Sequence, residues 1–145
     1  DVRDPEGMYV LLPLSVDGGT WYLDKPGAPV RPGLDQLPGA CCDYYCLQHG
    51  AAQCGKQGGV VFTTLDAPLV HVGAMRLWNY STSIEPRGPL YSWLTNNKWE
   101  TNFRISCGGA YEFRYIVQGG RELADSKSAL SMCRALSYPP LVTRK

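Results

Sequence analysis

The sequence lacks an excess of either charge and lacks a long hydrophobic run. Fourteen Lys and Arg residues against thirteen Asp and Glu residues leave a formal net charge of +1 over 145 residues. The basic residues are scattered, so they form neither the stripe that binds nucleic acid nor a polybasic membrane anchor. No apolar segment approaches the length needed to cross a bilayer, and no basic-then-apolar leader is visible at the N-terminus. We therefore expect no nucleic-acid partner and no membrane association.

The sequence also lacks a recognisable catalytic motif. It contains no Gly-x-Ser-x-Gly elbow, no His-Glu-x-x-His zinc motif and no phosphate-cradling glycine loop. A retaining glycosidase needs two carboxyl groups about 5 Å apart, and no two acids here form a sequence-local pair in an apolar setting. We therefore predict no catalytic residue and no metal ligand in this chain.

Cysteine is the one metal-binding residue type that clusters. The clustered residues are Cys41, Cys42, Cys46 and Cys54. Their spacing lacks the paired Cys-x2-Cys knuckles of a zinc ribbon, so we interpret them as small buried apolar residues. A structural metal site, or a disulfide to Cys107 or Cys133, is the alternative. His49 lies among them and could be a ligand or a general base, but no neighbouring residue would orient it, so we interpret it as structural.

Sixteen glycines and eleven prolines in a chain that is 19% charged indicate many turns between short strands. This composition predicts an all-β fold, an antiparallel β-sandwich in which two sheets bury their inner faces. At the end of the chain, Asp125 and Ser126 precede apolar residues spaced by three and four positions. We expect one short C-terminal helix of about three turns there.

The strands are predicted from apolar and alternating segments. These segments are Met8 to Val16, Thr20 to Leu23, Gly59 to Leu65, Leu69 to Val72 and Ala110 to Gln118. Pro13 cannot donate to a ladder, so the first strand should lie at an edge or bend there. The last has the cleanest alternation, which predicts an inward aromatic face ended by Gly119-Gly120. Residues 28–40 should form a long loop, and His71 should be a strand histidine with satisfied hydrogen bonds.

The stretch from Leu90 to Phe103 is the most unusual, because it holds two of the four tryptophans and three asparagines. We expect a strand, a corner at Asn96-Asn97, and a second extended segment. Indole faces beside carboxamides are typical of a sugar site, since a pyranose offers C–H faces to stack and hydroxyls to pair. The simpler alternative is a packed corner of the core in which the asparagines cap the turn.

This stretch resembles a known family. The segments that carry the resemblance are Tyr91-Ser92-Trp93, Asn96-Asn97, Trp99, Thr101-Asn102-Phe103, Gly108-Gly109 and Phe113-Arg114-Tyr115. Together they resemble the C-terminal β-rich region of glycoside hydrolase family 38, the retaining α-mannosidases. Two upstream blocks fit the same pattern in the same order, namely Asp35-Gln36-Leu37-Pro38-Gly39 and Asp66-Ala67-Pro68-Leu69-Val70.

The resemblance implies that the chain is a non-catalytic part of such an enzyme. Residues 1–145 would be a single β-sandwich domain, or a fragment of a larger C-terminal β domain with a galactose-mutarotase-like super-sandwich. The zinc ion and the carboxylate nucleophile of the family would lie in an upstream catalytic domain, which would be the partner of this chain. No cofactor is expected in the chain itself, and Lys145 would not be the natural end.

The residues that we assign to carbohydrate binding are Trp93, Asn96, Asn97, Trp99, Asn102 and Asp35. Mannose-containing glycans are the implied ligands. Two other functions remain open from the residues alone. One is a stand-alone carbohydrate-binding module, and the other is an interaction domain for a partner that is not a carbohydrate.

Overall fold

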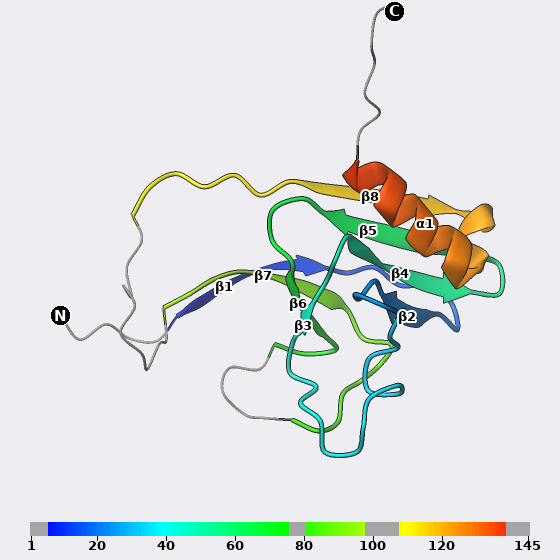
Figure 1. Ribbon diagram of the computed structural model, residues 1–145, viewed down its shortest axis with the longest axis horizontal. Coiled ribbons are helices and arrows are strands. Elements are labelled where there is room, and N and C mark those ends of the chain that lie inside the picture. Colours follow the sequence, from blue (N-terminus) through cyan, green and yellow to red (C-terminus); the bar gives the residue numbers. More distant parts are fainter. Residues whose placement is uncertain (1–5, 76–80, 98–107, 139–145) are drawn as a thin grey trace, which may run out of the picture.

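The computed structural model describes residues 6–75, 81–97 and 108–138, which form two four-stranded antiparallel sheets (Figure 1). Sheet A has the order β1 (Gly7–Leu12), β7 (Leu90–Asn96), β6 (Leu69–Val72) and β3 (Tyr45–Cys46). Sheet B has the order β2 (Thr20–Leu23), β4 (Gly50–Gly55), β5 (Gly58–Thr64) and β8 (Tyr115–Gly120). The all-β prediction is confirmed.

The main core lies between the two sheets. Trp21 and Phe62 from sheet B are fully buried against Val70 and Leu90 from sheet A. Successive residues of a strand point to opposite faces, so the next residues along β4 and β5 turn away from this core. This arrangement leaves sheet B with a second apolar face.

Helix α1 (Ser126–Ser137) covers that second face after the short 3-10 helix η1 (Arg121–Ala124) (Figure 1). Its buried residues, Ala129, Leu130 and Cys133, pack on the outward side chains of β4 and β5. The Asp125 carboxylate accepts the Ser128 backbone N–H at 2.8 Å and caps the first turn. The predicted short C-terminal helix is confirmed. No helix in the described part of the chain is long and apolar enough to cross a membrane.

Several strand predictions match closely. β2 and β6 have the predicted bounds, and β5 begins and ends one residue earlier than expected. β1 lies at the edge of sheet A as expected, but it ends at Leu12 and not at Val16, because Pro13 has no N–H to donate to the ladder. The loop of residues 28–40 contains only an isolated bridge between Val30 and Leu23.

The prediction of a strand from Ala110 to Gln118 is wrong at both ends. Pairing begins only at Tyr115, because Asp66 holds the backbone N–H of Arg114 at 2.8 Å before the ladder starts. The strand then continues through Gly119 and Gly120, which pair with the start of β5. The expected inward aromatic face shrinks to the ring of Tyr115.

Glycine at the β5 end of this pairing has a steric reason. A Cβ on Gly59 would lie 2.1 Å from the carbonyl oxygen of Leu123 in η1, so only glycine allows η1 to approach the sheet. Gly59, Gly119 and Gly120 are therefore part of the β5–β8 pairing, whereas Gly119 and Gly120 were expected to end the strand.

Candidate functional site

Trp93 on β7 packs within an aromatic cluster, which we define as Tyr9, Tyr44, His71 and Trp93. Its indole stacks on Tyr9, with ring centroids 5.8 Å apart and planes at 16°, and it approaches His71 at 5.1 Å. The indole N–H donates to the backbone oxygen of Thr95 at 3.0 Å. Trp93 therefore has one face and its N–H engaged by this chain, which is how a packed corner would use it.

The two asparagines lie where β7 ends. Asn96 pairs with Gly7 of β1, and the Asn97 side chain accepts the backbone N–H of Glu6 at 2.5 Å. The backbone N–H of Asn97 donates to the Glu6 oxygen at 3.0 Å, so this residue ties the two strand ends together. The expected second extended segment, with Trp99 and Asn102, lies outside the described residues.

Asp35 makes its contacts within its own loop. Its carboxylate accepts the Arg31 guanidinium at 2.6 Å and the Arg31 backbone N–H at 2.8 Å. These hydrogen bonds hold the pKa of Asp35 below its usual value. Among those of the six that the structure describes, Trp93 and Asn96 lie on β7 and Asn97 directly follows it, whereas Asp35 lies in another loop; the carbohydrate role of all six residues stays a prediction.

His71 differs from the expectation of a satisfied strand histidine. It is fully buried, yet neither ring nitrogen has a hydrogen-bond partner among the described residues. Desolvation lowers its pKa, and the nearby Asp43 only partly opposes that shift. The side chain lies on the outer face of sheet A, because its neighbour Val70 belongs to the core between the sheets. His71 is therefore buried by the rings of the aromatic cluster and not by the core between the sheets.

The apolar interpretation holds for two of the four clustered cysteines. Cys42 and Cys54 are buried, as is Cys133 further along the chain, whereas Cys41 is partly exposed and Cys46 is exposed. Burial raises the pKa of both Cys54 and Cys133 to about 11. The five cysteines of the described segments are all free thiols, and no three His, Cys, Asp or Glu side chains within those segments lie close enough to hold a metal ion. Cys107 lies outside the described residues.

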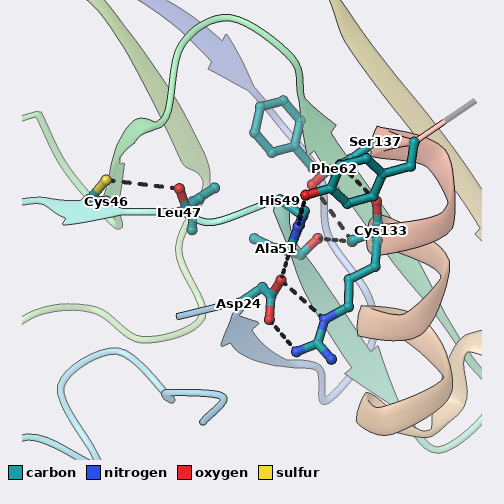
Figure 2. Close-up of polar contacts among 10 residues, drawn as sticks. Asp24, Cys46, Leu47, His49, Ala51, Phe62, Cys133 and Ser137 are labelled. Carbon is teal, nitrogen blue, oxygen red and sulfur yellow. Dashed lines mark hydrogen bonds and ion pairs between the residues drawn. The ribbon is translucent and has the colours of Figure 1, made fainter. Parts of the chain in front are cut away.

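A second polar site lies where sheet B meets α1 (Figure 2). Asp24 follows β2 directly, and His49 directly precedes β4. Because these strands pair antiparallel, with Leu23 opposite Ala51, the two side chains meet at the same end of the sheet. Arg134 reaches them from the last turn of α1 and Tyr138 from its C-cap. We call these four residues the Asp24 cluster.

The hydrogen bonds of the Asp24 cluster run in one direction. Asp24 is fully buried, and its carboxylate accepts His49 Nδ1 at 2.5 Å and Arg134 Nη2 at 2.7 Å. Burial by itself would raise the pKa of Asp24, but the hydrogen bonds from Arg134 and His49 outweigh it and lower the pKa. An ionised carboxylate only accepts, so Nδ1 carries a proton; in the neutral tautomer with that proton, the Nε2 lone pair faces the Tyr138 hydroxyl, 3.2 Å away.

Sequence reasoning missed this site because it sought the orienting partner of His49 in nearby sequence. The partner is Asp24, 25 residues upstream, and Arg134 lies a further 85 residues beyond His49. The pairing of β2 with β4 is the signal that would have brought Asp24 and His49 together.

Comparisons of the chain with protein-family models, with curated proteins and with solved structures found no match.

Proposed function

We propose that this chain is a non-catalytic β domain from the C-terminal part of an α-mannosidase-like glycoside hydrolase. It would support hydrolysis of α-mannosides by a catalytic domain upstream in the same polypeptide, where the zinc ion and the nucleophile would lie. One observation carries the proposal. Several of the separate sequence segments that resemble the family contact one another in the fold, as parts of one domain would.

The first of these contacts crosses the core. Val70, which ends one upstream block, pairs with Ser92 in the central stretch. The Ser92 hydroxyl then meets the Tyr115 hydroxyl of the opposite sheet at 2.9 Å. Tyr115 of sheet B is thus connected to two residues of sheet A, Ser92 and Val70, which precede it by 23 and 45 residues.

Two further contacts involve Asp66, in the second upstream block, and Gln36, in the loop block. Asp66 and Arg114 form a paired interaction, with carboxylate oxygens 2.9 and 3.0 Å from two guanidinium nitrogens. In the loop block, Gln36 accepts the Tyr45 hydroxyl at 2.7 Å, and Tyr45 pairs with Val70. These contacts link the loop block, the second upstream block, Tyr91-Ser92-Trp93 and Phe113-Arg114-Tyr115 to both sheets, which supports a role for the chain as one folded domain beside a catalytic neighbour.

The test is an activity assay on the natural full-length polypeptide that contains this chain. Release of 4-nitrophenol from 4-nitrophenyl α-mannoside should occur, should stop on zinc chelation and should return when zinc is added. The 145-residue chain assayed in parallel should show no turnover. A full-length polypeptide without α-mannosidase activity would contradict the assignment, and zinc-dependent turnover by the chain alone would contradict its non-catalytic role.

A second candidate is a stand-alone carbohydrate-binding module. Its supporting observation is that Trp93, Asn96 and Asn97 lie within five residues on β7 and just after it, while Tyr44, whose ring contacts Trp93 edge-on, is 48% exposed. This function predicts calorimetric binding of mannan oligosaccharides by the isolated chain. Trp99→Ala should abolish that binding while the circular dichroism spectrum is unchanged, and unchanged binding would argue against the module.

A further inference from the structure

The outer end of the Asp24 cluster is an accessible phenol on a buried imidazole. Tyr138 is 69% exposed, and its hydroxyl lies 3.2 Å from Nε2 of His49, which is only 8% exposed. The two rings meet edge-on, with centroids 5.4 Å apart and planes at 63°. Tyr138 is therefore largely open to solvent, whereas the base beside it is buried in the protein.

The arrangement has the parts of an activated nucleophile. Such a site needs a hydroxyl within hydrogen-bond reach of a base, and a third group that orients the base. Tyr138 supplies the hydroxyl, His49 the base and Asp24 the orienting carboxylate. Arg134 holds the other oxygen of Asp24 and keeps that carboxylate ionised, so Asp24 fixes the imidazole tautomer without taking its proton.

We propose that Tyr138 is a nucleophilic site that accepts acyl groups from small aryl esters, with His49 as its general base and Asp24 as the positioning residue. This activity is independent of the function proposed above. Because Tyr138 is largely exposed, little of the ester would be enclosed, so we expect small acyl groups to react regardless of their shape.

The reaction balances without a cofactor. The Tyr138 hydroxyl gives its proton to Nε2 of His49 while its oxygen bonds to the ester carbonyl carbon. The Arg134 guanidinium, which is about half exposed and has donors beyond those on Asp24, would be the cation of the cluster that offsets the negative charge on the carbonyl oxygen. The bond to the aryl oxygen then breaks, and the leaving phenolate takes the proton from the imidazolium. The products are an acylated Tyr138 and a free phenol.

The experiment uses 4-nitrophenyl acetate and the folded chain. Acetylated sites are located by peptide mass mapping, and hydroxylamine identifies tyrosine esters because it removes them and spares lysine amides. Tyr111 is the internal reference, since it is 54% exposed and stacks on Phe113. Acetylation of Tyr138 should be faster than that of Tyr111 in native protein, and concentrated urea should abolish the difference.

Variants then assign the roles. His49→Gln should slow acetylation of Tyr138 about 10²-fold, the size expected for one general base, while the rate at Tyr111 is unchanged. Tyr138→Phe, which removes one exposed hydroxyl, should lose the fast acetylation and keep the native fold, and Tyr111→Phe should keep both. Equal acetylation of Tyr138 and Tyr111 in the native wild type would overturn the proposal, and this result requires no variant to fold.

Discussion

Replacing Asp24 by Asn should destabilise the protein more than any other change of a single carboxylate in the described segments. The variant keeps the shape of the side chain but removes the charge that His49 and Arg134 share. A hydrogen bond to a charged group contributes about 1.5–3 kcal/mol. A fully buried ion pair that loses one partner costs about 3–5 kcal/mol, but Arg134 is 52% exposed and water can solvate it. We therefore expect a loss of about 2–3 kcal/mol.

Urea unfolding at neutral pH measures this loss. With a typical slope of about 2 kcal/mol per M urea, the midpoint should fall by roughly 1 M while the slope is unchanged. Asp35→Asn is the matched control, because Asp35 also binds an arginine but is solvent-accessible, and surface pairs contribute little. Equal midpoints for Asp24→Asn and Asp35→Asn would refute the reasoning.

The pH dependence provides a second check on Asp24. Its pKa is lower in the folded chain than in the unfolded chain, where it is about 3.9. The unfolded state therefore binds its proton first on acidification, so the stabilisation is complete above about pH 5 and is lost as the pH falls towards and through the folded value. The gap in stability between wild type and Asp24→Asn should be constant from neutral pH down to about pH 5 and should narrow below that.

Three further predictions follow from burial. Burial lowers the His71 pKa, so the unfolded wild type is protonated first and its stability should fall as the pH drops below about 6.5. His71→Phe should remove this loss, which urea midpoints at neutral and mildly acidic pH measure. Leu130→Ala should lower the free energy of unfolding by about 2–5 kcal/mol, measured by thermal unfolding, since Leu130 on the buried face of α1 is 2% exposed. In the native protein Cys46 should react with a thiol reagent, whereas Cys54 and Cys133 should react only after unfolding, because burial raises the pKa of each to about 11.

Features of the fold that depend on neighbouring residues could be predicted from the sequence. The capping carboxylate of Asp125 and the spacing of Ala129, Leu130 and Cys133 specify α1. The cap and the apolar face each depend on residues no more than four positions apart. Pro13 likewise marks the end of β1, since its missing N–H excludes the proline from the ladder. Such signals are local in sequence and need no knowledge of the partner strand.

The errors occur where a distant contact overrides the local pattern. The alternation from Ala110 to Gln118 is real, but Asp66, 48 residues earlier, captures the backbone of Arg114 and delays the strand. His71 alternates correctly on β6, yet rings from β1 and β7 bury a face that the strand pattern leaves outside. In both cases the deciding interaction joins segments whose proximity depends on sheet order, and the order within each sheet is not encoded in the periodicity of any one strand.

The Asp24 cluster shows the same limit at a potential reactive site. A lone histidine is uninformative, because its chemistry depends on which group orients its second nitrogen. For His49 that group becomes visible only once β2 is placed beside β4, and the accessible hydroxyl only once α1 is docked on sheet B. The apolar residues that specify this docking were predicted, and they are what bring Arg134 and Tyr138 to the end of the sheet. The polar site is therefore a consequence of the packing, and testing the reactivity of Tyr138 tests both together.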